Sequence, residues 1–394
     1  MERVPYALSY YGEREIKAVM EVLESGNTML GKNAHDLEAN IAREFGHDYG
    51  VMCNSGSSAL TLAISAMDLP VGSEVITPAL TFSTTVATQI QAGLVPVLVD
   101  SDIQTLNINI DLIENAITKK TRAMIIPDLM GNFSDWDRIR EIADKYGLLT
   151  LHDSADTIGQ RLRGKPVGAR ADISTTSLYG AHIINGAGNG GMVTTSNRDF
   201  MRQVRKVRSW GRESALFGES ENVDLRFDTM IDHIEYDNKF VFSSLGYNLE
   251  GSEISAAFAN VQYSRLDEFK ARRRAVYDAH IEFLSEYSEQ VILPTELDEA
   301  EVVWYAFPII LKENAAIGRK DLQVYLENKN IQTRPVFAGN IARQPGFKDK
   351  NFRIAGSLEN ADYVMKNALV IGCHQGMSDD QVNWVHECLR EVFK

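Results

Sequence analysis

Three short segments of the chain carry side chains that could bind an anion or move a proton. The first, Asn54–Ala59 (NSGSSA), follows an apolar run and opens a helical pattern. Backbone amides at a helix N-terminus, with small hydroxyl side chains beside them, form a pocket that suits a phosphate group. The segment is neither a GxGxxG motif nor a Walker loop, so a plain strand-to-helix turn with a serine cap is the alternative.

The second segment, Leu151–Asp156 (LHDSAD), lies at the end of a predicted strand. Active groups in open parallel sheets gather at the carboxyl ends of the strands. Asp153 could there hold the N–H group of a pyridinium ring, which keeps the ring positive and electron-withdrawing. The alternative is an aspartate that caps the following helix.

The third segment, Thr176–His182 (TSLYGAH), precedes the glycine-rich stretch Gly186–Gly191. Imidazole titrates near neutral pH, so His182 could serve as a general base or acid. A buried histidine with satisfied hydrogen bonds is the alternative for this residue.

These segments follow short apolar runs that alternate with amphipathic helical patterns. Such alternation predicts an α/β fold with a large, mostly parallel sheet that helices cover on both faces. The helical patterns include Ser57–Met67, Ile110–Ile117 and Trp136–Tyr146. The predicted strands are Tyr49–Cys53, Glu74–Thr77, Val95–Asp100, Ala123–Asp128, Leu148–Asp153, Asp172–Ser177 and Gly191–Thr195.

The last third of the chain has a different pattern. A long helical pattern starts near Ser252 and carries the basic run Lys270–Arg274, which is typical of a solvated helix face. We predict a large domain over residues 1–260, with an N-terminal arm, and a small C-terminal α+β domain over residues 261–394. The elements predicted for the small domain are a strand at Val302–Leu311, a helix at Arg319–Asn328 and a strand at Ala368–Cys373.

Composition limits the possible partners and the compartment. The net charge of -14 disfavours binding to nucleic acid or to an anionic membrane, so a phosphate-bearing ligand must be held by local groups. The chain has no apolar run long enough to span a bilayer, and its N-terminus lacks a signal-peptide pattern. Its three cysteines form neither a disulfide framework nor a CxxC metal signature, which fits a reducing cytoplasm.

The order and spacing of the three segments, together with a fourth at Leu245–Asn248 (LGYN), resemble those of the DegT/DnrJ/EryC1/StrS family of sugar aminotransferases. The resemblance covers nearly the whole chain. It implies the aspartate aminotransferase-like fold (fold type I), pyridoxal or pyridoxamine phosphate as cofactor, and a homodimer with shared active sites.

The resemblance also implies roles for individual residues. Asp156 stands where the family has Gln or Glu near the ring hydroxyl, and its shorter side chain weakens that predicted contact. The other implied roles are phosphate binding for Gly56, Ser57 and Ser177, stacking on the pyridine ring for Phe82, pairing with the ring nitrogen for Asp153, and, for Asn248, a contact with the cofactor phosphate of the neighbouring subunit.

One departure from the family pattern predicts the reaction. His182 occupies the position of the Schiff-base lysine, and no lysine lies between Lys165 and Lys206. Imidazole has no primary amine, so it cannot form a Schiff base, although it can still move protons. In this respect the chain resembles the histidine-containing 3-dehydratases of deoxysugar and O-antigen biosynthesis. The resemblance implies removal of the C3 hydroxyl from a nucleotide-linked 4-keto-6-deoxyhexose, with glutamate as the amine donor.

Several other functions are compatible with parts of the sequence. A related branch of dehydratases carries an iron–sulfur cluster and works with a separate reductase on a CDP-linked sugar. Cluster ligation usually takes four cysteines, and this chain has three, of which Cys53 precedes the phosphate turn. The remaining alternatives are an enzyme that still transfers an amine, against which the missing lysine argues, an aminotransferase-like protein without transaminase activity, and a cofactor-binding sensor or scaffold. The presence of Asp153, Ser177 and His182 together argues against the last of these.

Overall fold

The structure is a computed structural model, and it describes residues 3–216, 223–227 and 229–394. Its largest element is an eight-stranded sheet with the order β1-β9-β8-β5-β4-β2-β3-β16. The strands from β8 to β16 run parallel to their neighbours, whereas β9 is antiparallel to both β1 and β8. The bounds are β1 Tyr49–Cys53, β2 Glu74–Pro78, β3 Val95–Val99, β4 Thr121–Pro127, β5 Leu149–Ser154, β8 Ile173–Ser177, β9 Gly191–Thr195 and β16 Arg353–Ile354.

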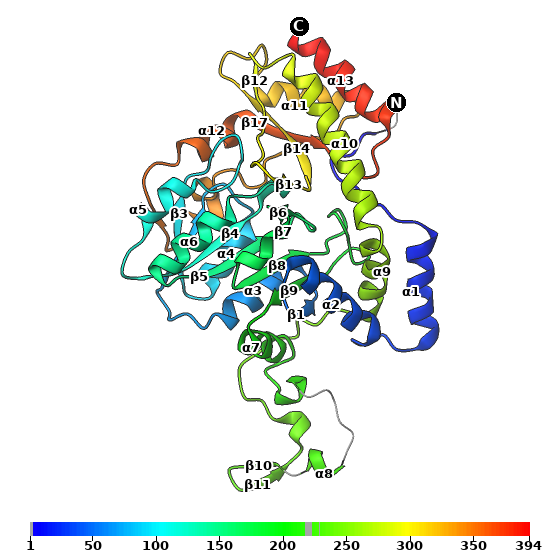
Figure 1. The fold of residues 1–394 in the computed structure, drawn as a ribbon, viewed down its shortest axis with the longest axis vertical. Helices are drawn as coiled ribbons and strands as arrows, with labels where there is room; N and C mark the ends of the chain where they lie inside the picture. Colours follow the sequence, from blue (N-terminus) through cyan, green and yellow to red (C-terminus); the bar gives the residue numbers. More distant parts are fainter. Residues whose placement is uncertain (1–2, 217–222, 228) are drawn as a thin grey trace.

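Both faces of this sheet are buried, because alternate residues of its strands enter different cores. Val51 and Cys53 pack with α3 (Gly56–Ala66) and α7 (Arg198–Arg208) on one face. Met52 points the other way and packs with α2 (Lys32–Phe45) and α9 (Glu253–Tyr263). Figure 1 shows the sheet at the centre of the molecule with helices on both sides. Further helices of this region are α1 Glu13–Ser25, α4 Ser83–Gln91, α5 Ile113–Ala116 and α6 Trp136–Tyr146.

A four-stranded antiparallel sheet, with the order β12-β14-β17-β15, forms the second layer of structure. It lies at the top of Figure 1, beside both chain termini. The second of its strands, β14, spans Ala306–Leu311, and all of its residues are buried. The remaining bounds are β12 Val291–Ile292, β15 Arg334–Pro335, β17 Ala368–Gly372, α10 Leu266–Ser285, α11 Arg319–Asn328, α12 Glu359–Asn367 and α13 Asp379–Phe393.

Two connections link these layers across the sequence. The short strand β16 pairs in parallel with β3 and so forms the edge of the large sheet. Near the N-terminus, Val4 forms a parallel bridge with Ile331, which precedes β15. Within the described ranges, no helix combines the length and the apolarity needed to cross a bilayer.

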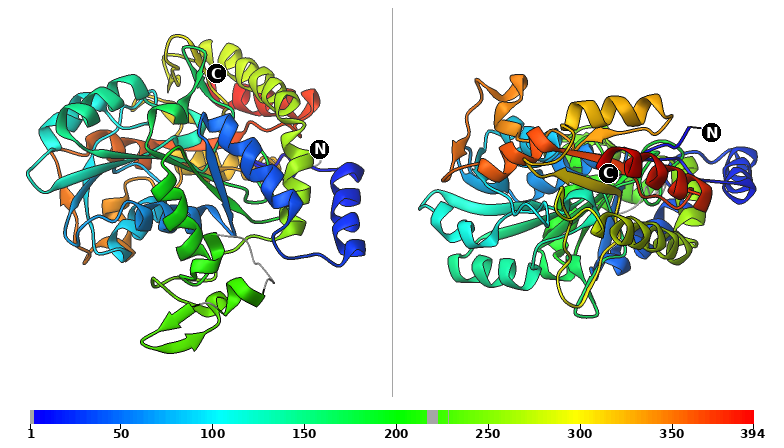
Figure 2. Two further views of the ribbon diagram at one scale, coloured as in Figure 1. Left: turned by 60° about the horizontal axis from the view of Figure 1, so that its bottom comes forward. Right: turned by 90° about the horizontal axis from the view of Figure 1, so that it is seen from above.

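The described residues between α7 and α9 form a projecting arm, which we define as residues 210–216, 223–227 and 229–247. It extends away from the body of the molecule, and its hairpin of β10 (Thr229–Ile231) and β11 (Ile234–Tyr236) lies at the tip (Figures 1 and 2). Large apolar side chains of the arm are exposed to an extent that is unusual for a monomer. They include Trp210, Phe227, Met230, Ile234, Tyr236, Phe240, Phe242, Leu245 and Tyr247.

Most of the predicted elements of the large sheet are present within a residue or two, and the predicted α/β class is confirmed. Three predictions need correction. The predicted strand Val302–Leu311 begins only at Ala306, because Tyr305 donates its backbone N–H to the Met130 carbonyl of the large sheet region. The predicted helix Ile110–Ile117 divides into a 3-10 turn and the short α5.

The third correction concerns the basic run Lys270–Arg274 in α10. Only part of this run faces solvent. Arg273 is 1% exposed and forms hydrogen bonds inside the protein. Five consecutive residues cover more than one turn of a helix, so one of them faces inward when a second layer packs on that helix. The sequence of a basic run does not show which residue this is.

Candidate active site

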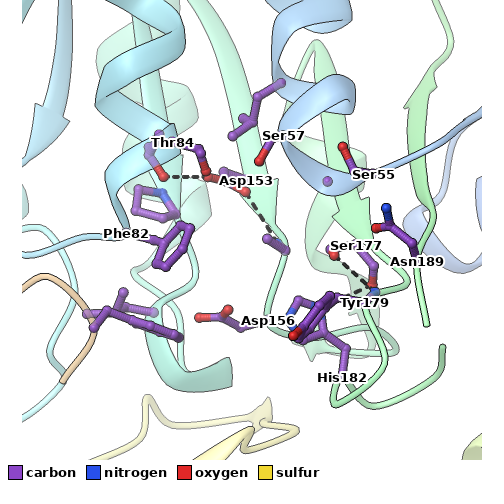
Figure 3. Close-up of a pocket in the computed structure, with 17 residues that line it drawn as sticks. Ser55, Ser57, Phe82, Thr84, Asp153, Asp156, Ser177, Tyr179, His182 and Asn189 are labelled. Atoms are coloured by element: carbon purple, nitrogen blue, oxygen red, sulfur yellow. Dashed lines mark hydrogen bonds between the residues drawn. The ribbon is translucent and has the colours of Figure 1, made fainter. Parts of the chain in front are cut away.

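A cavity of about 250 Å³ opens at the carboxyl ends of the parallel strands. It lies between β5 and β8 and the first turns of α3 and α4, and Figure 3 shows 17 of its lining residues. Seven of the eight predicted site residues line it together, although they come from four separate segments of the chain. These seven are Gly56, Ser57, Phe82, Asp153, Asp156, Ser177 and His182.

The first turn of α3 forms one end of the cavity. Ser55 caps the helix, because its hydroxyl accepts the backbone N–H of Ser58 at 3.1 Å. The backbone amides of Gly56 and Ser57 follow at positions where a helix has no internal partner for them. A Cβ atom on Gly56 would lie 2.6 Å from the Cβ of Ser177, so glycine is required for this close approach. The result is a cradle of amides and hydroxyls that suits a phosphate.

Asp153 lines the same cavity from the end of β5. Its Oδ2 accepts the hydroxyl of Thr85 at 2.8 Å, and its Oδ1 accepts the backbone N–H of Ala155 at 3.3 Å. Burial raises the pKa of Asp153 to about 6. A buried carboxylate of this kind gains most from a cationic partner, and a protonated ring nitrogen supplies one.

Asp156 lies in the cavity wall between Asp153 and His182 in the view of Figure 3. Its Oδ2 accepts the backbone N–H of Met130 at 3.2 Å. Burial, and then the negative charge of Asp153, raise the pKa of Asp156 well above its ordinary value. This carboxyl group therefore tends to keep its proton and can donate a hydrogen bond to a ligand oxygen. Its contact with the ring hydroxyl remains a prediction.

His182 lies in the turn that follows β8. Its Nδ1 is 3.3 Å from the carbonyl oxygen of Ser177, and its backbone N–H donates to the carbonyl of Tyr179. The rings of Tyr179 and Tyr305 contact the imidazole edge-on, with centroids 5.7 Å and 5.4 Å away. Burial lowers the pKa of His182 to about 4, opposed by the Ser177 carbonyl. The imidazole is therefore neutral at physiological pH and can accept a proton.

The other two predicted residues, Phe82 and Asn248, are exposed. Phe82 is 49% exposed at the mouth of the cavity, where its ring packs edge-on against Phe337. Its stacking on a cofactor ring stays a prediction. Asn248 does not line this cavity in the same chain; it is exposed and forms an isolated bridge with Ser209 at the base of the arm. Its predicted contact with a neighbouring subunit likewise stays a prediction.

Several lining residues were not predicted. Thr85 holds Asp153, and its place in the first turn of α4, three residues after Phe82, was an available signal. Tyr305 and Phe337 come from the C-terminal region, and no local pattern connects them with the site.

A second cavity of about 450 Å³ adjoins the first and shares Phe82, Tyr179, His182 and Phe337 with it. It opens toward the C-terminal layer. Its further lining includes three aromatic side chains, Tyr6, Tyr305 and Phe347, and one cationic side chain, Arg334. His182 therefore faces both cavities.

The residues of the first cavity fit the predicted pyridoxal phosphate. The glycine-dependent cradle at Gly56 and Ser177 suits the phosphate, and the buried Asp153 suits the ring nitrogen. Among the described residues that line the cavity there is no lysine to bond the cofactor covalently, and His182 lies there instead.

Comparison with known proteins agrees with this site. Residues 9–390 match the profile of the DegT/DnrJ/EryC1/StrS aminotransferase family. The chain is 36% identical over 385 residues to the dTDP-4-dehydro-2,6-dideoxy-D-glucose 3-dehydratase of Saccharopolyspora spinosa, and the match covers 95% of this chain and 83% of the relative.

Two solved structures have nearly the same fold. One is the E. coli GDP-4-keto-6-deoxy-D-mannose-3-dehydratase with bound hydrated PLP; it is 28% identical with a TM-score of 0.89, covering 99% of this chain and 100% of that one. The other is a GDP-4-keto-6-deoxymannose-3-dehydratase with a trapped PLP-glutamate geminal diamine, at 28% identity and a TM-score of 0.89, covering 98% and 100%. The predicted family and fold are thereby confirmed.

Proposed function

The chain belongs to the DegT/DnrJ/EryC1/StrS aminotransferase family, and from this membership and its site we propose that it is a pyridoxal-phosphate-dependent 3-dehydratase of a nucleotide-linked 4-keto-6-deoxyhexose. One observation carries the proposal: His182, and no lysine, is found among the described residues that line the cofactor cavity. The similar proteins whose names include 3-dehydratase support the same reaction class.

The bound cofactor supplies an electron sink and carries the amino group that an amino donor provides. The first turn of α3 and the Ser177 hydroxyl would hold its phosphate. Asp153 would keep the ring nitrogen protonated, and Thr85 orients that carboxylate. These residues therefore set the position and the electron demand of the reacting group, while proton transfer falls to another side chain.

His182 performs the proton transfer in this proposal. The Ser177 carbonyl can only accept, so Nδ1 carries the proton and the lone pair of Nε2 is the basic site. Nε2 takes up the proton whose removal allows the C3 hydroxyl of the sugar to leave. The same nitrogen can then return a proton, as a general acid does.

The absence of a covalent bond between the protein and the cofactor decides the outcome of the reaction. A lysine would retain the product and support amino transfer to the sugar. With imidazole at this place, the deoxygenated product is released and loses its amino group to water as ammonia. The expected final product is a 3,6-dideoxy-4-keto sugar still linked to its nucleotide.

The second cavity would hold the sugar nucleotide. It shares His182 with the cofactor cavity, so a sugar bound there can reach both sites. Its aromatic walls suit a sugar ring and a base, and Arg334 offers a positive charge for the diphosphate. Such a local cation is needed in a chain with a net charge of -14.

Glutamate is the proposed amine donor. The solved relative with a PLP-glutamate adduct supports this choice, since it matches nearly the whole chain. We expect the enzyme to act in deoxysugar biosynthesis in the cytoplasm, where its three buried free thiols remain reduced.

We also propose that two copies form a dimer with shared sites. The exposed apolar side chains of the arm support this, because a second copy would cover them. Asn248 lies at the base of the arm and is itself exposed, so it is available to a partner's cofactor phosphate.

The alternative function is a dehydratase that passes its intermediate to a reductase. An iron–sulfur cluster for that purpose usually needs four thiolates. The three cysteines of the chain lie in or beside β1, β17 and α13, and each is buried and free. Turnover with glutamate and without NAD(P)H distinguishes the two functions.

The direct test is an assay of 4-keto-6-deoxyhexoses linked to GDP, dTDP and CDP, with glutamate as donor and ammonia release as readout. Dehydration of one of them without a reductase would support the proposal. Formation of a stable 4-amino sugar would show that the chain is a transaminase instead.

A further inference from the structure

Arg273 is a buried cation at the centre of the C-terminal layer. It lies in α10 and is only 1% exposed. Its Nη1 donates to the carbonyl oxygens of Trp304 at 2.8 Å, Tyr305 at 3.0 Å and Cys373 at 2.9 Å. These acceptors carry no charge, so they do not neutralise the guanidinium. Burying a charge in this way is costly, and it lowers the pKa of Arg273 to about 10.

The fourth partner of Arg273 is the side chain of Gln375, which is also buried. Its Oε1 accepts the Nε–H of Arg273 at 2.7 Å. Because the guanidinium offers only donors, the amide oxygen must face it and the amide nitrogen must point away. That nitrogen donates to the carbonyl oxygen of Ile183 at 3.2 Å. Arg273 thus fixes the orientation in which Gln375 can bond to the residue after His182.

The turn that carries His182 is held in part by the buried side chains of Ile183 and Ile184, which pack in the core with α2 and α9. The backbone of Ile183 lies between two glycine-containing stretches, and neither a strand nor a helix includes it. Inside the turn, the N–H of Gly180 bonds to Gly188 and that of Gly186 bonds to Leu178. The bond from Gln375 ties the backbone of this turn to the C-terminal layer, in addition to the ring contact between His182 and Tyr305.

The same arginine reaches His182 by a second route. It holds the carbonyl of Tyr305, whose ring contacts the imidazole with centroids 5.4 Å apart. Its positive charge also adds to the effect of burial in lowering the pKa of His182. Arg273 therefore influences His182 in three ways: through Gln375 and the backbone of the turn, through Tyr305, and through its own positive charge.

We propose that Arg273 and Gln375 form a positioning unit that holds His182 in place for proton transfer, by anchoring the Ile183 carbonyl behind it. This inference rests on the proposed function for its catalytic consequence. Its structural content, the link between Gln375 and the His182 turn, can be tested on its own.

Two variants of Gln375 separate geometry from charge. Gln375→Met keeps the volume but removes both hydrogen bonds, so kcat should fall about tenfold to a hundredfold, the scale of a small displacement of a catalytic group. The sugar KM and the cofactor Kd should stay near the wild-type values. Gln375→Glu places a carboxylate beside Arg273 and should raise the pKa of His182 by about one unit.

The second readout is the rate at which diethyl pyrocarbonate modifies His182 in the full-length protein without sugar, measured by peptide mass spectrometry from pH 5 to pH 8. Only neutral imidazole reacts, and burial holds the pKa of His182 near 4, so the wild-type rate should be almost flat. In Gln375→Glu the rate at pH 5 should fall about twofold or more relative to pH 8. In Gln375→Met the profile should stay flat.

Gln290→Glu is a matched control. Gln290 also bridges backbone groups of the C-terminal layer, donating to the Phe393 carbonyl at 2.8 Å and accepting from Ala316 at 2.9 Å. It should change neither kcat nor the modification profile.

Wild-type kcat in Gln375→Met overturns the proposal, as does a flat profile in a folded Gln375→Glu. If Gln375→Glu fails to fold, the kcat of Gln375→Met decides alone. If the wild-type protein dehydrates no sugar, the proposed function fails, while the modification profiles still decide whether Gln375 controls His182.

Discussion

The Nδ1 atom of His182 lies 3.3 Å from the carbonyl oxygen of Ser177, the residue whose hydroxyl faces the first turn of α3. In the proposed site, one residue would therefore bind the phosphate through its side chain and favour one tautomer of the base through its backbone. The end of β8 would then link the position of the cofactor to the orientation of the basic nitrogen.

Replacement of His182 by asparagine tests the base. His182→Asn retains a hydrogen-bonding group near Ser177 but cannot accept a proton at neutral pH. Dehydration should fall by about 10²- to 10⁴-fold, the usual contribution of a general base, while cofactor binding measured by absorbance persists. A wild-type rate of sugar dehydration in this variant would show that His182 is not the base.

His182→Lys places a primary amine in the cofactor cavity. The lysine should bond covalently to the cofactor, so borohydride should trap an adduct on residue 182 that is absent in the wild type. The rate of dehydration should fall steeply, because the pKa of the lysine amine does not suit proton transfer near pH 7 as that of imidazole does. Mass spectrometry of the reduced protein provides the measurement, and a trapped lysine in the wild-type protein would contradict the noncovalent site.

Asp153→Asn tests the electron sink. A neutral amide cannot hold the ring nitrogen protonated, so the rate should fall about a hundredfold or more, as when one preorganised electrostatic partner is lost. Thr85→Val is the matched control, because it removes one hydrogen bond to Asp153 at 2.8 Å but leaves the charge. Its effect on kcat should be much smaller. Equal rates for Asp153→Asn and the wild type would refute the assignment.

Mixed dimers test whether the active sites are shared. Asn248→Asp would place a negative charge near a partner's cofactor phosphate, so this variant and His182→Asn should each be nearly inactive. Co-refolding equal amounts should restore about a quarter of wild-type activity, because half of the dimers are mixed and each has one intact site. Activity that stays at the level of the separate variants would indicate that Asn248 acts within its own chain.

Acid should destabilise the contact between α10 and α13. The Nδ1 of His280 lies 2.9 Å from the Nε2 of His386. Burial lowers the pKa of His280 to about 3 and that of His386 to about 4. Below about pH 6.5 the unfolded chain binds more protons than the folded protein, so the free energy of unfolding falls as pH falls.

Urea unfolding at pH 7.5 and pH 5.5 measures this effect. Each buried histidine should cost about 1 kcal/mol at the lower pH. His386→Gln should reduce the difference between the two pH values by about that amount, whereas the exposed control His35→Gln should not. An unchanged pH dependence in His386→Gln would rule out this pair as a source of acid sensitivity.

The sequence allows most of the large sheet and the core of the site to be predicted. The strands β1 and β9 and the helices α6 and α11 have the predicted bounds, because each pattern is local and strongly periodic. Asp153 and His182 could be found because Asp153 lies near the end of a strand and His182 in the turn after one, each in a segment that resembles the family pattern. Parallel strands then bring these ends together.

The rest of the site depends on contacts between distant parts of the chain. Tyr305 reaches His182 only because its backbone pairs with Met130 and bends Val302–Tyr305 away from a strand. Arg273 looks like a surface residue among basic neighbours, and only the packing of α10 shows that it is buried. Such contacts leave no periodicity in the sequence, so pattern analysis cannot detect them.

The edge strand β16 has a consequence for how a newly made chain reaches this fold. It pairs with β3, although most of the chain separates the two in the order of synthesis. Until Arg353 and Ile354 leave the ribosome, the outer edge of β3 presents unpaired backbone groups, which can recruit strands of other chains. The nascent protein is therefore most exposed to aggregation late in translation, and truncation just before β16 should leave a product that associates rather than one that folds.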